Sequence, residues 1–356
     1  MLDVGRLQKH KYIKKGKNMI EKRDLPVVNK ITRRTVLSLP AAAIFAPAIV
    51  RAQTAAWPNR LIRIVVPFGT GGGTDITMRL LAPKMSELLG QPIIIDNRPG
   101  GGSTVGTDYV AKQPPDGYTI VLASLSSTGI AATLYPNLPY DPVKDLVAIA
   151  PTVFVPIGLS VTTKGLNVKT VPEFVAALKA APDKFSYGSA GIGTTGHLAS
   201  SAFLQRTGTQ AVHIPYRSPS EVYKAMISGE IQFNSDIPSI MAPFHRAGQV
   251  RMLLVATDQR SPSLPDVPTA AELGMKDYKA YSWYGLFAPS GTRQAVVDRL
   301  AAVVEQALKD PAISAKFDDM GTPAMVGYTP SRFAQYVKDE VAIWGPMVKA
   351  SGARVE

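Results

Sequence analysis

The chain of 356 residues contains no cysteine and four histidines. The lack of cysteine excludes disulfide bonds, thiol nucleophiles and thiolate metal ligands. Three of the histidines, His197, His213 and His245, follow residue 52, and no spacing pairs them with each other or with acids as metal ligands. We predict that His197 makes a local hydrogen bond at a helix start and that His213 is a satisfied residue within an apolar strand. We therefore expect no catalytic residue, no metal site and no cofactor.

The body of the chain also lacks a basic stripe with interleaved aromatic residues. The formal net charge is +12, but residues 1–52 hold 12 Lys or Arg and 3 acids and so carry +9 of it. This leaves +3 (12 − 9) for residues 53–356, which is mildly basic. We therefore expect no nucleic-acid partner.

No apolar run in the sequence is typical of a membrane-spanning helix. The apolar stretch 36–50 is short for a span and contains two prolines, and it follows the pair Arg33-Arg34. This order is typical of a twin-arginine-like export leader over residues 1–52, with a buried N-terminal helix as the alternative. The long basic prefix leaves open whether Met19 is the true start. We expect the mature chain to lie in the periplasm.

Beyond the leader, strand-like and helix-like runs alternate almost to the end of the chain. Such an order predicts an α/β fold with mainly parallel sheets and helices on both faces. The expected strands are 61–68, 92–96, 118–124, 153–161, 185–189, 211–217, 231–236, 250–257 and 281–288, and the expected helices are 76–89, 103–113, 171–181, 196–207, 219–228, 238–247 and most of 293–349.

The pattern restarts near residue 153, which predicts two α/β lobes with a ligand cleft between them. Two extended crossings, near 153–160 and 281–288, would join the lobes and act as hinges. We assign residues 53–155 and 287–356 to lobe 1 and residues 156–286 to lobe 2.

Two glycine-rich turns stand where an expected strand passes into an expected helix. Glycine lets a backbone approach a ligand closely, and a helix N-terminus presents unpaired N–H groups and partial positive charge. Such turns bind anions without Lys or Arg, although tight, well-capped turns are the alternative. Ligands of open α/β sheets bind at the carboxyl ends of strands, so both turns are expected to face one cleft. The candidate ligand-binding residues are Phe68, Gly69, Thr70, Gly71, Gly72 and Asp75 in the first turn, and Ser189, Ala190, Gly191, Gly193, Thr194 and Thr195 in the second.

Two further candidates, Ser124 and Asp236, end expected strands. For Asp236 two interpretations stay open. It is either a cap for the helical segment that begins at Pro238, or an acceptor at the cleft edge that orients ligand hydroxyls or ordered water.

The second turn also spells G-x-G-x-x-G over residues 191–196. A dinucleotide fold needs this motif on its first strand and an acid at the end of the next strand. Here the next expected strand ends in Ile214-Pro215-Tyr216-Arg217, without an acid. Because an arginine can accommodate a 2′-phosphate, an exported NAD(P)-dependent oxidoreductase remains the alternative function.

Motifs spread over residues 57–355 resemble the substrate-binding proteins of tripartite tricarboxylate transporters, the Bug family of extracytoplasmic solute receptors. They are Ile64–Phe68 with Gly71–Asp75, Asn97–Gly100, Pro115–Thr119, Tyr140–Pro142, Tyr187–Gly191 with His197-Leu198, His213–Tyr216, Leu264–Thr269 and Trp283–Leu286. The sequence departs from the family pattern at Gly69-Thr70, where a small residue and proline are usual, and at Ser218, where glycine is usual.

The resemblance implies a type 2-like periplasmic binding protein that closes around a small organic carboxylate. It places carboxylate binding on two strand–turn–helix elements, which match residues 68–75 and 189–195. It further implies a receptor without catalytic activity, integral membrane permease subunits as partners, and a monomer.

Overall fold

The computed structural model describes residues 56–278 and 280–353, so the predicted leader, residues 1–52, lies outside the described residues. No helix in the described part is long and apolar enough to cross a membrane. The elements in chain order are β1 Ile62–Val66, α1 Gly73–Leu89, β2 Ile93–Asn97, α2 Thr104–Ala111, β3 Thr119–Ser124, α3 Ala131–Leu134, β4 Leu146–Pro156, β5 Gly158–Thr162, α4 Val171–Ala180, β6 Ser186–Ser189, α5 Thr195–Thr207, β7 Val212–Pro215, α6 Pro219–Ser228, β8 Phe233–Asp236, α7 Pro238–Arg246, β9 Val250–Val255, β10 Tyr281–Pro289, α8 Gln294–Leu308, α9 Pro311–Asp319 and α10 Pro330–Ala350.

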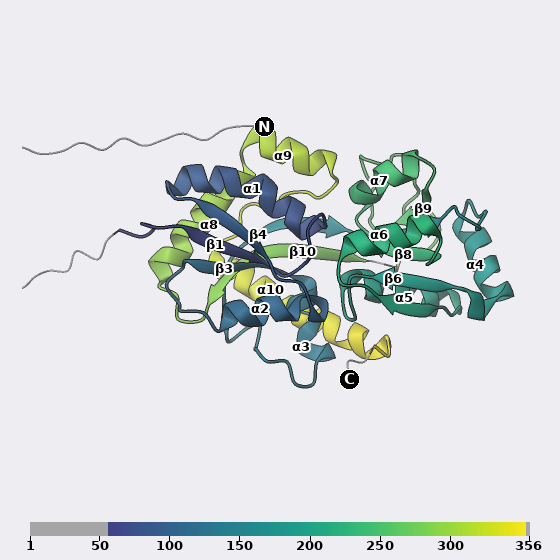
Figure 1. Ribbon diagram of the computed structural model, residues 1–356, viewed down its shortest axis with the longest axis horizontal. Coiled ribbons are helices and arrows are strands. Elements are labelled where there is room, and N and C mark those ends of the chain that lie inside the picture. Colours follow the sequence, from purple (N-terminus) through teal and green to yellow (C-terminus); the bar gives the residue numbers. More distant parts are fainter. Residues whose placement is uncertain (1–55, 279, 354–356) are drawn as a thin grey trace, which may run out of the picture. The chain divides into compact units, whose positions relative to one another are not determined.

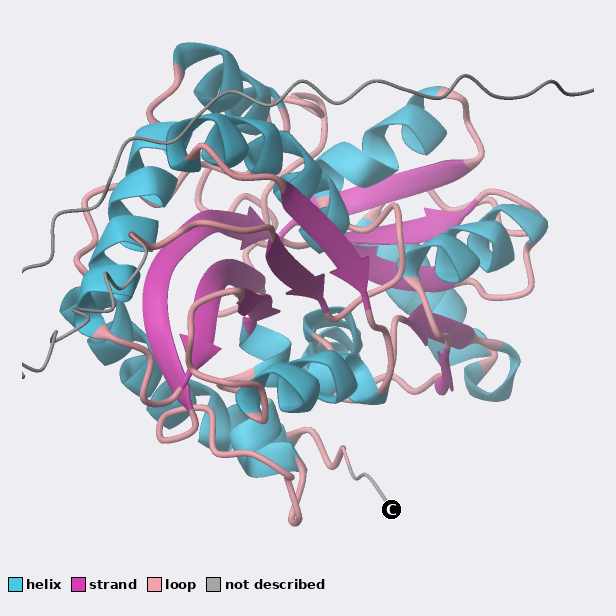
Figure 2. Cartoon of the chain, turned by 60° about the vertical axis from the view of Figure 1, so that its left-hand side comes forward, coloured by secondary structure: helices cyan, strands magenta, loops and turns pink. Residues whose placement is uncertain are grey.

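The first sheet, sheet A, has the strand order β2-β1-β3-β10-β4. β1 is parallel to β2 and β3, whereas β10 is antiparallel to both β3 and β4. Side chains alternate between the two faces of a strand. Ile62, Ile64 and Val66 accordingly pack in the same cluster as α1 and α8, and Val65 packs with α2 and α10 on the other face. Figure 2 shows helices on both sides of the strands.

The second sheet, sheet B, has the order β7-β6-β8-β5-β9. β6 is parallel to β7 and β8, and β5 is antiparallel to β8 and β9. Phe174 of α4 and Phe203 of α5 pack with Phe233 of β8, while Val222 of α6 and Met241 of α7 lie in a separate cluster. Each sheet is therefore mixed rather than mainly parallel. One reversed strand, β10 in sheet A and β5 in sheet B, pairs antiparallel with both of its neighbours and follows a crossing between the sheets.

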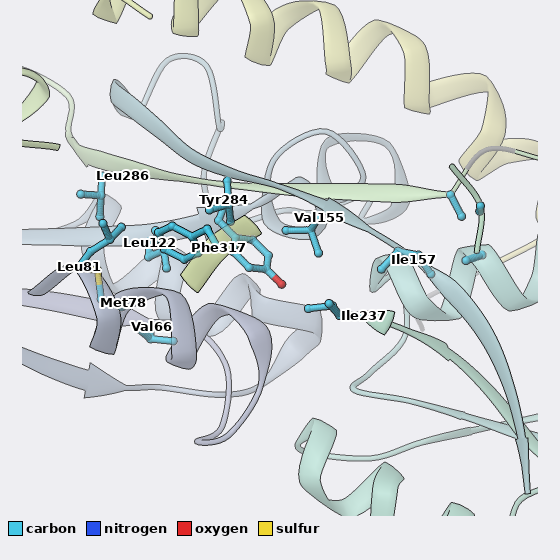
Figure 3. Close-up of a cluster of buried hydrophobic side chains, with 14 of the residues drawn as sticks. Val66, Met78, Leu81, Leu122, Val155, Ile157, Ile237, Tyr284, Leu286 and Phe317 are labelled. Atoms are coloured by element: carbon cyan, nitrogen blue, oxygen red, sulfur yellow. The ribbon is translucent and has the colours of Figure 1, made fainter. Parts of the chain in front are cut away.

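The two crossings lie side by side. β4 leads through Ile157 directly into β5, and Ile157 N–H donates to Ala280 O at 3.2 Å, next to the start of β10. Figure 1 shows β4 and β10 running from sheet A toward the elements of sheet B. Val155 and Ile157 carry the buried core along this crossing (Figure 3).

The α/β class, the two lobes and the two crossings predicted from the sequence are confirmed. The prediction missed the short helix α3 and the first seven residues of β4, so the strand begins at Leu146 rather than Val153. The lobe boundaries stay a proposal. β10 pairs with β4 from Tyr281 to Pro289, so sheet A extends on the N-terminal side of the boundary set at 286/287.

Candidate functional site

A cavity of about 80 Å³ lies where the carboxyl ends of strands from both sheets meet. Its lining comes from the strand ends β3, β6 and β8, from the N-termini of α1, α5 and α6, and from the crossings. The lining residues are Phe68, Gly73, Thr74, Ser124, Ser126, Ile157, Gly188, Ser189, Ala190, Thr194, Thr195, Gly196, Pro219, Val222, Asn234, Ser235, Asp236, Ile237, Ser282 and Tyr284. None of these described residues is Lys, Arg or His. Among them, Asp236 has the one carboxyl side chain.

The first glycine-rich turn leads from β1 into α1 and is held by Asp75. The Asp75 carboxylate accepts Gly71 N–H at 3.0 Å and Arg79 Nε–H at 2.9 Å, and its other oxygen accepts Asn97 Nδ2–H at 3.0 Å. Asn97 Nδ2 also donates to Phe68 O at 3.0 Å. These bonds fix the turn from inside, which gives Asp75 a positioning role.

The hydrogen bonds also determine the charge of Asp75. Burial pushes its pKa up, but the hydrogen bonds from Arg79, the Gly71 N–H and Asn97 outweigh burial and lower the pKa. Asp75 is therefore an ionised carboxylate at neutral pH, bound to its own turn.

The second turn leads from β6 into α5 and is held by Ser189, Thr194 and two histidines. Ser189 Oγ donates to Gly191 O at 2.9 Å and lies 2.7 Å from His213 Nε2. Gly193 N–H donates to His197 Nδ1 at 3.2 Å, and the Thr194 hydroxyl caps α5 by accepting His197 N–H at 3.4 Å. The prediction that His197 forms a local hydrogen bond is confirmed, and His213 is a satisfied side chain.

The two imidazole rings stack with their centroids 3.9 Å apart, and Tyr187 stacks on His213 at 4.9 Å. Burial lowers the pKa of His197 to about 4. Burial, followed by the neighbouring His197, lowers the pKa of His213 to about 3. Both rings are therefore neutral at physiological pH, and the second turn contains no cationic side chain.

The donors at the cavity come from helix N-termini and hydroxyl groups. α1 begins after Gly72 without a side-chain cap, so the N–H groups of its first turn have no acceptor inside the helix. Gly73 and Thr74 of this turn line the cavity, as do Thr195 and Gly196 at the start of α5. Ser126 reaches across from sheet A and accepts Thr195 N–H at 3.2 Å. The N-termini of α1, which follows a strand of sheet A, and of α5, which follows a strand of sheet B, thus face the same cavity. The partial positive charge of a helix N-terminus attracts an anion.

Glycines of both turns make the close contacts between the elements of sheets A and B. At Gly73, a Cβ atom would overlap Ile237 and lie 2.6 Å from the Tyr284 hydroxyl. Figure 3 shows that hydroxyl turned toward Ile237. At Gly193, which has φ +78°, a Cβ would overlap Leu134 of α3. The missing side chains therefore allow protein, rather than a ligand, to approach the backbone at these positions.

The two departures from the family pattern face each other across the same contact. A Cβ at Gly69 would lie 2.7 Å from Cβ of Ser218, so serine at 218 requires glycine at 69. Beside them, Ser220 Oγ donates to Thr70 O at 3.0 Å. Ser218 also caps α6 by accepting Glu221 N–H at 3.4 Å.

The remaining polar wall of the cavity belongs to β8. Asn234 is buried, and its Oδ1 has no hydrogen-bond partner among the described residues. Asp236 accepts Ile237 N–H at 2.8 Å. Burial raises its pKa to about 6, against the lowering effect of that hydrogen bond and of Tyr223. The N-cap position of α7 is Ile237, without a side-chain cap. Of the two interpretations of Asp236, the structure therefore favours an acceptor at the cavity over a helix cap.

The cavity collects half of the residues predicted from the sequence. Phe68, Ser124, Ser189, Ala190, Thr194, Thr195 and Asp236 line it, whereas Gly69, Thr70, Gly71, Gly72, Asp75, Gly191 and Gly193 do not. Gly191 instead lies against Gly102, and a Cβ added to it would lie 3.3 Å from Gly102 N. Whether any of the fourteen contacts a ligand stays a prediction.

Sequence reasoning missed several lining residues, among them Ser126, Asn234, Ser282 and Tyr284. Asn234 had a usable signal, because it lies two residues before Asp236 on the same strand and so shares its face. Ser126, Ser282 and Tyr284 come from other parts of the chain, and their positions depend on the packing of the two sheets.

The dinucleotide alternative gains no support from the second turn. In a dinucleotide site, the glycines leave room for a pyrophosphate beside the helix N-terminus. Here Leu134 occupies the space next to Gly193, and the adjacent strand β7 ends at Pro215 without an acid. The volume of about 80 Å³ is also small beside the roughly 300–1,000 Å³ of pockets for larger ligands.

Comparison with known proteins places this architecture among periplasmic receptors. The structure of the periplasmic binding protein BugD is 30% identical, with a TM-score of 0.80, and the match covers 84% of this chain and 100% of that one. MatC from Rhodopseudomonas palustris with bound malate is 31% identical, with a TM-score of 0.78 over 82% and 99% of the two chains. R. palustris Rpa4515 with adipate is 33% identical, with a TM-score of 0.78 over 84% and 100%.

The family model described as tripartite tricarboxylate transporter family receptor matches residues 77–353. This range contains the second turn, β8 and both crossings, and it starts within α1. The chain therefore belongs to the tripartite tricarboxylate transporter family of receptors, as the sequence motifs predicted.

Proposed function

We propose that the protein is a periplasmic solute receptor that captures a small organic carboxylate in this cavity and delivers it to the integral membrane permease of a tripartite transporter. The observation that carries the proposal is the pair of helix N-termini, from α1 and α5, that face one cavity lined by no cationic side chain among the described residues. Backbone N–H groups and hydroxyls in a desolvated space bind carboxylates through charge-assisted hydrogen bonds.

The position of the cavity supports a closing mechanism. Residues next to both sheets form its walls. The chain passes between the two sheets at two adjacent crossings, one where β4 continues into β5 and the other at β10. A ligand that contacts both sets of elements stabilises the closed arrangement by its differential affinity for it. The ligands bound in MatC and Rpa4515, malate and adipate, are small carboxylates of the expected kind.

The proposal is tested by thermal-shift screening of the full chain, followed by calorimetric titration. The compounds are carboxylates with two to six carbon atoms, the matching neutral amides, and NAD and NADP. At a concentration of 100 Kd, one bound acid is expected to add about 2.7 kcal/mol to the free energy of unfolding. The amides should add nothing, because they lack the negative charge that the helix N-termini attract. Stabilisation by NADP, with no response to any carboxylate, would contradict the proposal.

A further inference from the structure

The wall of the cavity on β8 carries acceptor groups that a carboxylate held at the helix N-termini does not use. Asn234 and Asp236 are two residues apart, so their side chains leave the same face of the strand, and both line the cavity. Asn234 is 1% exposed, and its Oδ1 has no hydrogen-bond partner among the described residues. A buried acceptor without a partner costs free energy, so this wall indicates a ligand that donates hydrogen bonds to it.

Asp236 is the second acceptor of the wall. One of its oxygens accepts the Ile237 N–H at 2.8 Å, which uses one of the roughly four acceptor positions of a carboxylate. Gly158, its pairing partner on β5, contributes no side chain. The titratable groups that face it are the hydroxyls of Tyr223 on α6 and Tyr284 on β10. Burial, and then the nearby Asp236 charge, raise the pKa of both hydroxyls, which therefore stay neutral.

We infer that Asn234 and Asp236 make the receptor select carboxylates that also carry a hydroxyl or ammonium donor over the same carbon skeleton without that donor. The inference rests on the proposed function, since it assumes that the ligand carboxylate lies at the N-termini of α1 and α5. It adds a requirement that the family membership does not contain, namely a donor group directed at β8.

The selection follows from what an acid without a donor would leave behind. It would bury the Asn234 Oδ1 without a partner, and it would bring a second negative charge into a small cavity beside ionised Asp236. A site built to hydrogen-bond a ligand group discriminates strongly against an analogue that lacks the group. An ammonium can donate to both acceptors, and its positive charge offsets the repulsion. A hydroxyl has one O–H and donates to one of the two acceptors, so it removes one of these penalties.

The inference is tested by calorimetric titration of the full chain at pH 8 with matched acids. Malate, aspartate and succinate share four carbons and two carboxylates but carry a hydroxyl, an ammonium and no donor, and lactate, alanine and propionate form the same series with one carboxylate. We expect the preferred donor-bearing acid to bind roughly ten- to hundred-fold more tightly than its donor-free partner. The hydroxyl and ammonium arms identify which donor the wall accepts.

Three variants separate the two acceptors from general charge effects. Asp236→Asn should tighten binding of the donor-free acid and bring the affinity ratio toward one. Asn234→Leu should weaken the donor-bearing acid while the influence of Asp236 remains. Asp277→Asn is the matched control, because its side chain is 89% exposed and outside the cavity, and it should leave the ratio unchanged.

The affinity ratio between acids with and without the donor is also measured as a function of pH. This ratio would not change with pH if Asp236 had a purely structural role. Burial, opposed by the Ile237 N–H and Tyr223, sets the pKa of Asp236 at about 6. Protonation between pH 8 and 5.5 then removes the charge and supplies an O–H donor to acids that lack one, so the preference should shrink in the wild type. His197 and His213, with pKa values of about 4 and 3, stay neutral over this range. Titration of the ligands affects wild type and Asp236→Asn alike, so the difference between their profiles reports Asp236.

The outcomes distinguish this inference from the proposed function. Equal affinities for acids with and without the donor, in both series, would overturn the inference and leave the receptor function standing. Failure of every carboxylate to bind would overturn the proposed function itself. If Asp236→Asn does not fold by circular dichroism, the wild-type ratio for lactate and propionate between pH 8 and 6 decides. Both acids stay ionised in that range, so a ratio that is independent of pH there contradicts the role of Asp236.

Discussion

Two carboxyl groups, Asp75 and Asp236, lie at junctions between a strand and a helix, and their surroundings differ. Asp75 is buried outside the cavity lining, whereas Asp236 is half-buried and lines the cavity. Asp75 accepts hydrogen bonds from Gly71, Arg79 and Asn97, which outweigh its burial and lower its pKa. For Asp236, burial outweighs the lowering effects of the Ile237 N–H and of the nearby Tyr223, and raises the pKa to about 6. The number of donors around each carboxylate therefore assigns Asp75 to the architecture of the turn and leaves Asp236 available to a ligand.

Asp75→Asn tests the positioning role of the first acid. The amide would present N–H atoms to one of the donors from Gly71, Arg79 and Asn97, and the charge-assisted bonds would be lost. We expect the free energy of unfolding at pH 7, measured with urea, to fall by about 2 kcal/mol, with the contribution of half-exposed Arg79 reduced by solvent. Because the native pKa lies below the ordinary value of 3.8, the difference from wild type should begin to shrink as the pH falls below about 4 and should be lost once the pH is below the native pKa. Asp277→Asn is the control, and equal losses in both variants would contradict the role.

At the scale of elements, the turn from β6 into α5 depends on neutral histidines. His197 must be unprotonated at Nδ1 to accept the Gly193 N–H, and His213 stacks against it. Both native pKa values lie below the ordinary value of 6.5. The unfolded chain therefore binds more protons than the native chain below pH 6.5, and stability rises with pH in that range.

The free energy of unfolding is expected to fall as the pH is lowered from 7 toward 4. A change in pKa from 6.5 to about 4 at His197 corresponds to at most about 3 kcal/mol. His197→Asn retains an acceptor near the Nδ1 position without a group that titrates, so its pH dependence should be shallower than that of the wild type. Urea denaturation at half-unit pH intervals measures both curves. A wild-type stability that stays flat from pH 7 to 4.5 would rule out this linkage.

Hydrophobic periodicity in the sequence is sufficient to predict most elements, and the exceptions have physical causes. The pattern predicts that β4 begins at Val153 because Pro151 interrupts the preceding apolar run. The strand accommodates Pro151 because β4 is at the edge of sheet A, where a missing N–H is tolerated, and a register shift occurs at the Gly285 opposite. The turns at residues 68–75 and 189–195 are recognisable from local glycine and hydroxyl patterns. Tyr284 and Ser126 are not, since only the packing of β10 and of the segment after β3 brings them to the cavity.

At the scale of the whole described molecule, the glycine-rich turns form the contact between the elements of the two sheets. Gly73 and Gly193 adjoin Ile237 and Leu134, and the backbone of Gly102 meets that of Gly191 and Ile192. Closure around a ligand needs these surfaces to meet without side chains between them. The glycine-rich turns that the sequence indicated as anion-binding elements therefore limit how closely the two sets of elements approach each other. We expect these glycines to change the affinity for a ligand through this closure rather than through direct contact.

Gly193→Ala separates closure from the fold. Its Cβ would overlap Leu134, which belongs to the opposite set of elements, and the affinity for carboxylates should fall at least roughly tenfold because the closed state is disfavoured. Gly208→Ala is the matched control. Gly208 also has a positive φ, +61° against +78° at Gly193, but no atom lies within 4 Å of its added Cβ. Both variants carry comparable backbone strain, so both should lose similar stability in thermal melts. Calorimetric titration should then show weakened binding in Gly193→Ala alone. An equal loss of affinity in both variants would mean that backbone strain in α5 and its turn, rather than closure, determines the affinity for the ligand.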